Sequence, residues 1–444
     1  MFNYKEVVPM NHIHSSGQQV ETVRVAWRRG AMIAVAAVAV IALAGCSSKG
    51  ADAGGGTDEA GIKTGPGVSD TTITLGALTD LSGPFAVVGS ALTQGEQLYF
   101  DQLNADGGVC GRTIELDVKD HGYDVQKAVG LYTDLAPGVL SMVQMLGSSI
   151  TAALAQNVDT DNILTIPFSW ASTGLASPHD LMAGTSYDVD MVNGVSWLAD
   201  SQGLVAGDKV GHIYIEGEFG TNAHLGVQYA TDQLDLELVS SQVTASTTDL
   251  SSQVADLKNQ GVKAIIASVV PGQMASVASV VESSGLNVPI LGNSISFVPQ
   301  LLDTSAKASL EKNLYIAQSW DTYSGESDGA ATVREAYAEK YTDVPNAFVT
   351  VGYGGAQTFG AVLQKACDNG DLTREGLATA FTETTSVDTG NLLPDLDYGT
   401  PGEPPTRHSL IAKVDSSVDG GLTVVEPLAE SKLGGSYPAP AAGN

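Results

Sequence analysis

The chain has 444 residues, of which 43% are hydrophobic, so it can bury a large core, and its length suggests two or three domains. It carries 21 Lys and Arg side chains against 50 Asp and Glu, a formal net charge of -29. We expect no nucleic-acid partner, because phosphate binding requires clustered cations that this composition lacks. The acidity is more simply explained by solubility outside the cell.

The N-terminal part of the chain has the pattern of an export signal. Three arginines between residues 24 and 29 precede an apolar run, 31–44, which ends in Leu-Ala-Gly-Cys at Cys46. A basic segment followed by an apolar segment too short to span a bilayer predicts a secretory signal over residues 1–45. The four-residue ending resembles a bacterial lipobox, which implies cleavage before Cys46 and lipidation of its thiol. Residues 46–70, rich in Gly, Ala, Asp and Ser, are predicted to form a flexible tether.

The following stretch alternates apolar strands with amphipathic helices. Its first unit is a strand, a Ser-Gly-Pro turn, a long helix, a Gly-rich loop and a second strand, which together form a βαβ unit. The predicted strands of this series are 73–78, 113–118, 139–146 and 163–167, and the helices after the first are 125–135 and 151–158. The polar segment 173–190 is expected to be irregular and to cross between lobes.

A second α/β series follows. Its predicted helices are 191–202, 222–234, 250–260 and 273–284, and its strands are 210–215, 237–243, 264–270 and 288–291. After them come a strand over 314–318 and helices over 330–341, 347–366 and 373–381, the last with Thr373 as its N-cap. Two such series predict an α/β fold with two doubly wound, parallel-sheet lobes.

The opening of the first series also resembles a known family. The runs LSGPFAVVG, DQLNADGGVCGRTIEL and DHGYDVQKAV are similar to those of branched-chain amino acid (Leu/Ile/Val) type ABC transporter substrate-binding lipoproteins, of the type I periplasmic binding protein family. The resemblance covers about residues 72–425. It implies a hinge of several crossings, with lobe 1 formed by 71–189 and 319–408, lobe 2 by 190–318 and 409–430, and a tail over 431–444 that is frayed from Tyr437. Strands 408–414 and 422–425 would complete lobe 2.

The resemblance implies a function as well as a fold. Such a protein would be exported and lipid-anchored to the outer face of the bacterial cytoplasmic membrane. There it would capture, as a monomer, a small amino-acid-like, carboxylate or amide ligand between its lobes and deliver it to a permease and an ATPase that are separate chains. A lipid-anchored, ligand-sensing receptor that is not coupled to import is the alternative. The sequence of this chain does not separate the two.

Catalytic and cofactor motifs are missing from the sequence. It contains no Gly-x-Ser-x-Gly elbow, His-Glu-x-x-His, phosphate loop or Gly-x-Gly-x-x-Gly. The histidines beyond the signal are scattered singly, so each is read as a loop or packed residue and not as a metal ligand. We therefore expect neither an enzyme nor a bound cofactor or metal.

Two cysteines remain if Cys46 is lipidated. In an exported protein, leftover cysteines are more often paired than free, so we expect a disulfide between Cys110 and Cys367. The pairing requires the loop after the first long helix to approach the end of the helix that contains Cys367.

Gly147-Ser148-Ser149 is the most informative polar site. It follows an apolar strand and opens a helix, whose free N–H groups and positive dipole end can bind a carboxylate together with the two hydroxyls. The alternative is that Ser148 or Ser149 is an ordinary N-cap. The resemblance implies that a serine here binds the ligand carboxylate, and that residues 82–88 form the rim of the same lobe.

Aromatic residues complete the expected site. The resemblance implies that main-chain and hydroxyl groups around Phe168, Ser169 and Trp170 bind the carboxylate. Trp170 would supply a flat apolar wall or, alternatively, pack on the hinge side. Phe219 would close over the ligand from the second lobe. Phe348 resembles another pocket-lining aromatic, although it opens a helix and could equally belong to the core.

One position departs from the family pattern. Relatives that bind α-amino acids carry an acidic residue after the strand equivalent to 288–291, where it pairs with the ligand ammonium, but this chain has Ser294 or a near neighbour there. Val270 also stands where a second pocket aromatic is expected. An unpaired ammonium in a closed cleft costs several kcal/mol, so an ordinary branched-chain amino acid is disfavoured. A carboxylic acid, an amide or a differently held amino acid fits better, unless the pairs Asp188 and Asp190 or Glu216 and Glu218 restore the charge.

Overall fold

The structure is a computed structural model that describes residues 55–438. The predicted signal, Cys46 and the first part of the predicted tether therefore lie outside the described residues. None of the helices within 55–438 combines the length and the apolar composition that a membrane span requires.

The elements follow the predicted alternation. The first series consists of β3 (Thr72–Thr79), α1 (Ala86–Ala105), β4 (Thr113–Asp120), α2 (Val125–Leu135), β5 (Met142–Met145) and α3 (Ser148–Asp161). The second consists of α4 (Tyr187–Gln202), β6 (Lys209–Ile215), α5 (Glu218–Gln233), β7 (Glu237–Val243), α6 (Ser251–Gln260), β8 (Ala264–Ser268), α7 (Pro271–Ser283), β9 (Ile290–Asn293), α8 (Lys307–Asn313) and β10 (Leu314–Gln318). The remainder contains α9 (Asp328–Lys340), α10 (Ala347–Asp368), α11 (Arg374–Glu383), β12 (Ser409–Val414), β13 (Leu422–Ala429) and α12 (Lys432–Ser436).

The first sheet is parallel, in the order β4-β3-β5. The strand predicted over 163–167 does not form a continuous ladder with it: apart from isolated bridges at Thr165, to Met142 and Asp180, the segment has no strand pairing. Pro167 lacks an N–H and cannot extend the pairing. The prediction of a fourth strand is thus wrong, although the backbone of this segment still runs beside β5 through hydrogen bonds such as Ile166 N–H to Met142 O, 2.9 Å.

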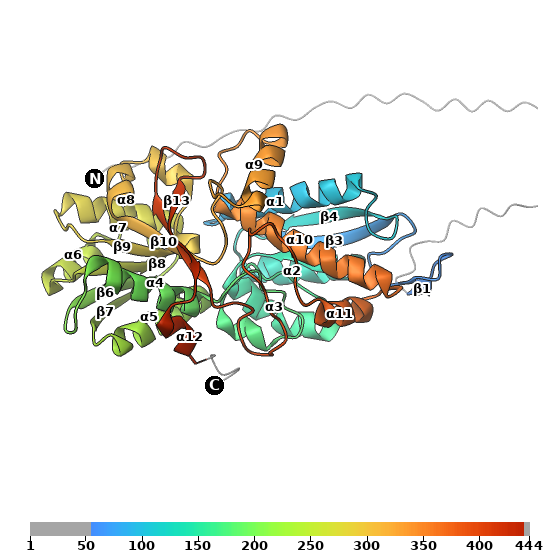
Figure 1. Ribbon diagram of the computed structural model, residues 1–444, viewed down its shortest axis with the longest axis horizontal. Helices are drawn as coiled ribbons and strands as arrows, with labels where there is room; N and C mark the ends of the chain where they lie inside the picture. The colour runs from blue at the N-terminus through green and yellow to red at the C-terminus, as the bar shows by residue number, and fades with distance from the viewer. Residues whose placement is uncertain (1–54, 439–444) are drawn as a thin grey trace, which may run out of the picture. The chain divides into compact units, whose positions relative to one another are not determined.

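The second sheet has seven strands, in the order β13-β12-β10-β9-β8-β6-β7 (Figure 1). β7, β6, β8, β9 and β10 are parallel, whereas β12 and β13 join antiparallel at one edge. The two late strands therefore return to the sheet formed by the middle of the chain. The doubly wound α/β prediction is confirmed, with a mixed edge, and the numbered lobe boundaries remain a prediction.

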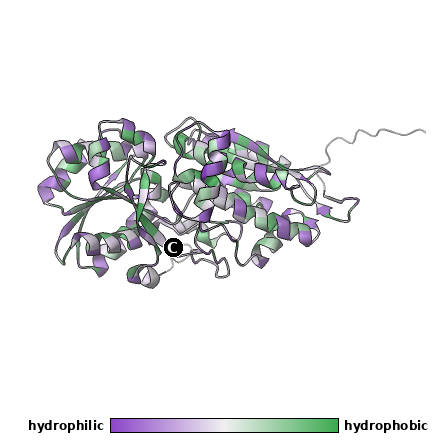
Figure 2. Cartoon of the chain, turned by 45° about the horizontal axis from the view of Figure 1, so that its top comes forward, coloured by the Kyte–Doolittle hydropathy of each residue, from purple (hydrophilic) through white to green (hydrophobic). Residues whose placement is uncertain are grey.

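The core lies between these sheets and their helices. Strands β5 and β8 are buried along their whole length, as expected where helices cover both faces of a parallel sheet. Figure 2 shows the same division, with hydrophobic colour on the strands of the large sheet and hydrophilic colour on the outer sides of its helices. The crossing segment is less irregular than predicted, because α4 begins at Tyr187 with Ser186 as its N-cap.

Helices α1 and α10 pack closely, and a disulfide fastens the ends of this pair. A Cβ at Gly95 would lie 2.2 Å from the carbonyl oxygen of Val349, so only glycine permits this approach. Cys110, in the loop after α1, is bonded to Cys367 near the end of α10, with their Cα atoms 5.8 Å apart. The predicted disulfide is confirmed.

The predicted tether is wrong for residues 55–70. β1 (Gly56–Thr57) pairs with β2 (Lys63–Thr64), which in turn pairs with β11 (Asp371–Leu372). Asp58 accepts a charge-assisted hydrogen bond from Arg112, and both side chains are largely buried. Pairing with distant partners orders a segment whose own composition offers little to bury.

The predicted tail is also wrong for the residues that are described. Helix α12 packs on α4, and Tyr437 is buried, with its hydroxyl donating to Asp188 at 3.2 Å and its ring 4.8 Å from that of Tyr229. An aromatic residue with a buried polar partner is not a frayed end.

Candidate functional site

A pocket lined by aromatic side chains lies at the N-terminus of α3. We call it the aromatic pocket. It is lined by Phe85, Tyr123, Leu146, Gly147, Ser148, Phe168, Tyr187, Phe219 and Ile295. Its free volume is about 10 Å³, roughly what one water molecule occupies. The rings nearly fill the space, so a ligand must displace some of them.

Ser148 provides a polar group of the pocket at the start of α3. Gly147 is the N-cap of α3 and has no side chain that could cap the helix, and the N–H groups of Ser148 and Ser149 make no hydrogen bond within residues 55–438. Ser148 is the first helical residue, and neither serine caps the helix through its side chain. The N-cap alternative is thus wrong. The Ser148 hydroxyl instead accepts from Ser169, 2.8 Å away, inside the pocket wall.

Tyr123 covers this helix terminus because of two local features. A Cβ at Gly147 would lie 2.6 Å from the Tyr123 ring, so glycine is required for the ring to pack there. Tyr123 itself has a left-handed backbone (φ 62°), held by donation of its N–H to the His121 ring at 2.9 Å. Burial raises the pKa of Tyr123, partly opposed by its hydrogen bond with Ser149. The phenol therefore remains a neutral hydrogen-bond donor.

The Ser-Gly-Pro turn positions Phe85 through a buried carboxylate. Asp80, at the end of β3, accepts from the backbone N–H groups of Ser82, Gly83 and Phe85. The turn thereby places the Phe85 ring against that of Tyr123, with centroids 4.7 Å apart. Val88, by contrast, is buried in the core.

Tyr187 and Phe219 form the opposite side of the pocket. Their ring centroids lie 4.8 Å apart, and Phe219 occupies the first turn of α5. Burial raises the pKa of Tyr187, against the effect of its hydrogen bond with Ser148. Hydrogen bonds from Thr173 to Glu218 and from Asn222 to Ser172 connect the start of α5 to the segment after Phe168.

Ser294 does not itself line the pocket. It follows β9 and precedes the lining residue Ile295, and its hydroxyl has no hydrogen-bond partner within residues 55–438. The side-chain amide of Asn293 is equally buried and unpaired. The end of β9 therefore presents neutral groups and no carboxylate.

Two predicted aromatics are packed away from the pocket. The Trp170 indole N–H donates to Ala183 O at 2.8 Å, and its ring stacks on Trp320 with centroids 4.7 Å apart. Phe348 is buried, and its ring centroid lies 6.0 Å from that of Trp320. Neither lines the aromatic pocket, so the packing alternative describes both residues.

None of the four alternative carboxylates lines the pocket. Asp188 is buried and accepts from Ser186, Asn222 and Tyr437, and Asp190 accepts from Ser409 at 2.6 Å. The Glu216 side chain is exposed, and Glu218 bonds to Thr173. The proposal that one of these pairs replaces the ammonium partner finds no geometric support among the described residues.

Sequence reasoning missed several lining residues. Phe85 and Tyr123 both line the pocket and both lie in the sequence runs that carry the family resemblance. Phe85 fell within the predicted rim, 82–88, but no role was predicted for it, and Tyr123 was not predicted to belong to the site. A Gly-Tyr pair after a strand could have suggested Tyr123, since a strand end in a parallel sheet faces the ligand crevice. Tyr187 and Ile295 gave no local signal. Within residues 55–438, no group of three or more His, Cys, Asp or Glu side chains is placed to hold a metal ion.

Comparison with known proteins gives one family. The sequence profile of a family described as "Periplasmic binding protein" matches residues 72–421. A structure of the fatty acid ABC transporter substrate-binding protein from Thermomonospora curvata is 42% identical, covers 87% of this chain and 100% of its own, and superposes with a TM-score of 0.85. A branched chain amino acid ABC transporter protein from Thermus thermophilus with bound valine is 16% identical, covers 83% of this chain and 99% of its own, and has a TM-score of 0.74.

The curated relatives agree over a shorter stretch. The Leu/Ile/Val-binding protein homolog 7 of Brucella abortus is 24% identical over 222 residues, which is 47% of this chain and 54% of the relative. The chain thus matches about half the length of these relatives.

Proposed function

The chain belongs to the periplasmic binding protein family, whose members are solute-binding proteins of ABC transporters and not enzymes, and from this premise we propose that its ligand is a small apolar monocarboxylic acid. The carboxylate would bind at the N-terminus of α3, and the hydrocarbon part would lie among the rings of the aromatic pocket. The protein would be anchored through Cys46 and would deliver this acid to a permease.

The observation that carries the proposal is the chemistry of the pocket lining. Its polar side-chain groups are the hydroxyls of Ser148, Tyr123 and Tyr187, next to the free N–H groups of α3, and all its other lining residues are apolar. Neutral donors and a helix N-terminus favour an anion. An ammonium would find no carboxylate among the lining residues and would be left unpaired.

The relative with 42% identity supports the same class of ligand. It is described as a fatty acid ABC transporter substrate-binding protein, and this chain covers all of it. The neighbours below 25% identity share the fold and do not bear on the ligand.

A thermal unfolding screen tests the proposal. The chain from residue 47 onward, unfolded and refolded to remove carried-over ligand, would be heated with straight-chain and branched acids, the corresponding amides, and amino acids. Because a ligand that binds only the folded state raises the midpoint, we expect shifts with the acids and smaller or no shifts with the amides and amino acids. A larger shift with valine or leucine than with any acid would overturn the proposal. Loss of acid uptake on deletion of the gene would separate import from sensing.

A further inference from the structure

A second hollow lies apart from the aromatic pocket and shares no lining residue with it. Its walls are the 3-10 turn Ser172–Ala176, the residues that follow this turn, the end of α11 and the loop 398–405. Its free volume is about 170 Å³, on the order of ten times the space that one water molecule needs. The hollow is therefore large enough for a small organic molecule.

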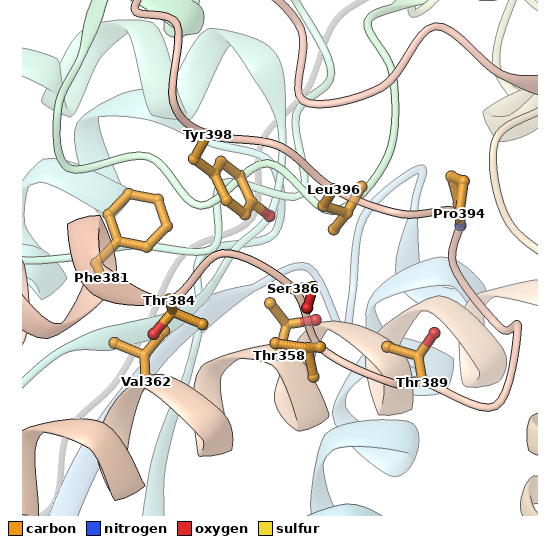
Figure 3. A pocket seen from close by; sticks show the side chains of 10 residues that line it. Thr358, Val362, Phe381, Thr384, Ser386, Thr389, Pro394, Leu396 and Tyr398 are labelled. Atoms are coloured by element: carbon orange, nitrogen blue, oxygen red, sulfur yellow. The ribbon is translucent and has the colours of Figure 1, made fainter. Parts of the chain in front are cut away.

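Most of the walls are apolar and held in place. Leu175, Met182, Phe381 and Tyr398 line the hollow together with three prolines. The Phe381 and Tyr398 rings, with centroids 4.8 Å apart, also border a second, much smaller cavity, in which Figure 3 shows them next to each other. The Tyr398 hydroxyl donates to Met182 O at 3.0 Å, and Gly402 N–H donates to Leu175 O at 3.1 Å. These bonds tie the two loops that form the walls.

The charged residues of the lining are both acidic. The carboxylate of Glu403 is paired with Arg407, 2.7 Å away. Asp180 accepts from Thr165 through Oδ1 at 2.7 Å and has no Lys, Arg or His within ion-pair distance among residues 55–438. Its Oδ2 lies 3.1 Å from the position of a Cβ on Gly174, a lining residue, so the absence of a side chain there leaves this oxygen uncovered on that side. We call this site the acidic hollow.

We propose that the acidic hollow is a second binding site, for a small apolar molecule that carries an ammonium group, with Asp180 as its ionic partner. An unpaired carboxylate beside apolar walls favours a cation, because each charge relieves the desolvation of the other. The prolines and rings suit an aromatic or aliphatic body. The proposal is independent of the ligand of the aromatic pocket.

The pH dependence follows from Asp180. Burial raises the pKa of Asp180 to about 6, so the side chain is charged at neutral pH and becomes neutral under mild acid. The charge of Asp159, in α3, also raises the pKa of Asp180, whereas that of His179, the preceding residue, lowers it. Glu403, in the loop 398–405, lines the same hollow. Binding of an amine should weaken as the pH falls from 7.5 to 5.

Titration calorimetry with phenethylamine, on the chain from residue 47 onward, tests the proposal. At pH 7.5 the amine should bind at least about tenfold more tightly than 2-phenylethanol, which lacks the charge, since hydrogen bonds to charged groups are the stronger ones. Asp180→Asn should remove about tenfold or more of this affinity. Asp159→Asn, which removes a nearby charge outside the hollow, should change it by less than about twofold.

Two further variants keep the test decisive. Leu175→Trp fills the hollow and should abolish amine binding even if Asp180→Asn folds poorly. Phe219→Ala, which removes apolar lining from the aromatic pocket without adding a charge, should leave amine binding unchanged. The proposal is overturned if the amine does not bind, if the amine and the alcohol bind equally, if Asp180→Asn has no effect, or if the amine binds only through the aromatic pocket.

Discussion

The two walls of the aromatic pocket differ in what they offer a ligand. The wall next to the sheet β4-β3-β5 carries Tyr123, Ser148 and the start of α3, and thus presents hydroxyls and free N–H groups. The wall that follows strands of the seven-stranded sheet carries Phe219 and Ile295, and the two residues before Ile295 have neutral, unpaired side chains. The first wall, together with the Tyr187 hydroxyl, is suited to an anion, and the Phe219 and Ile295 side chains are suited to hydrocarbon.

This difference explains how one fold can change its ligand. An α-amino acid needs an anion site and a cation site at once, whereas an apolar acid needs only the first. The helix terminus is built into the α/β architecture, because α3 must begin where β5 ends. On the family pattern, the cation site depends on one acidic side chain after β9, so a single substitution would remove it without altering the fold.

A negative charge on the first wall should have the largest effect. Ser148→Asp places a carboxylate where the ligand carboxylate is proposed to bind, and repulsion in a dry pocket should weaken the binding of acids by at least about a hundredfold. Ser251→Asp, the same change at the exposed first residue of α6, is the matched control. Equal binding by both variants would place the acid elsewhere.

A negative charge on the second wall should reverse the preference. Ser294→Glu supplies the missing ammonium partner, so leucine should gain and 4-methylpentanoate should lose about tenfold in affinity. Without ligand, the buried charge should also lower the unfolding midpoint. Ser283→Glu, on the exposed surface of α7, should do neither. If leucine gains nothing, Ser294 does not face the ligand.

Removal of hydrocarbon from the second wall should have a smaller effect that depends on the ligand. Phe219→Ala should cost 4-methylpentanoate about tenfold in affinity but leave acetate nearly unchanged, because only the longer acid loses apolar contact. Phe348→Ala is the comparison, since Phe348 packs on Trp320 and not in the pocket. It should lower the unfolding midpoint without changing the ratio of the two affinities.

The buried carboxylates beside the pocket should affect stability and not binding. Burial raises the pKa of Asp190 to about 8, well above its value in the unfolded chain. The folded state thus retains a proton that the unfolded state releases, so this contribution to stability is complete below about pH 4 and declines as the pH rises through 8. The unfolding midpoint should fall between pH 6 and 8.5, and Asp190→Asn should flatten that slope. An unchanged slope in the variant would assign the effect to another group.

Much of the fold could be predicted from local pattern. The helix predicted over 125–135 coincides with α2, and Thr373 caps α11 by accepting from Gly376 N–H. Amphipathic periodicity and helix capping depend on residues close together in the chain, so they can be predicted from the sequence. The pairing of Cys110 with Cys367 was predictable from composition and export, although their proximity was not.

The remaining features depend on residues far apart in the chain. β1 and β2 are each two residues long and gain order from β11, about 300 positions later. Tyr187 reaches the pocket only because α4 begins earlier than its polar sequence indicated. The first wall was therefore partly predictable, whereas most of the aromatic lining required the tertiary structure.

The most direct test is a pair of calorimetric titrations that differ in one group. Leucine and 4-methylpentanoate share their carboxylate and hydrocarbon, and only leucine carries the ammonium. With carried-over ligand removed, 4-methylpentanoate should bind at least about tenfold more tightly, because no lining residue neutralises the ammonium. Tighter binding of leucine would contradict the account and would require an acidic partner that the aromatic pocket does not contain.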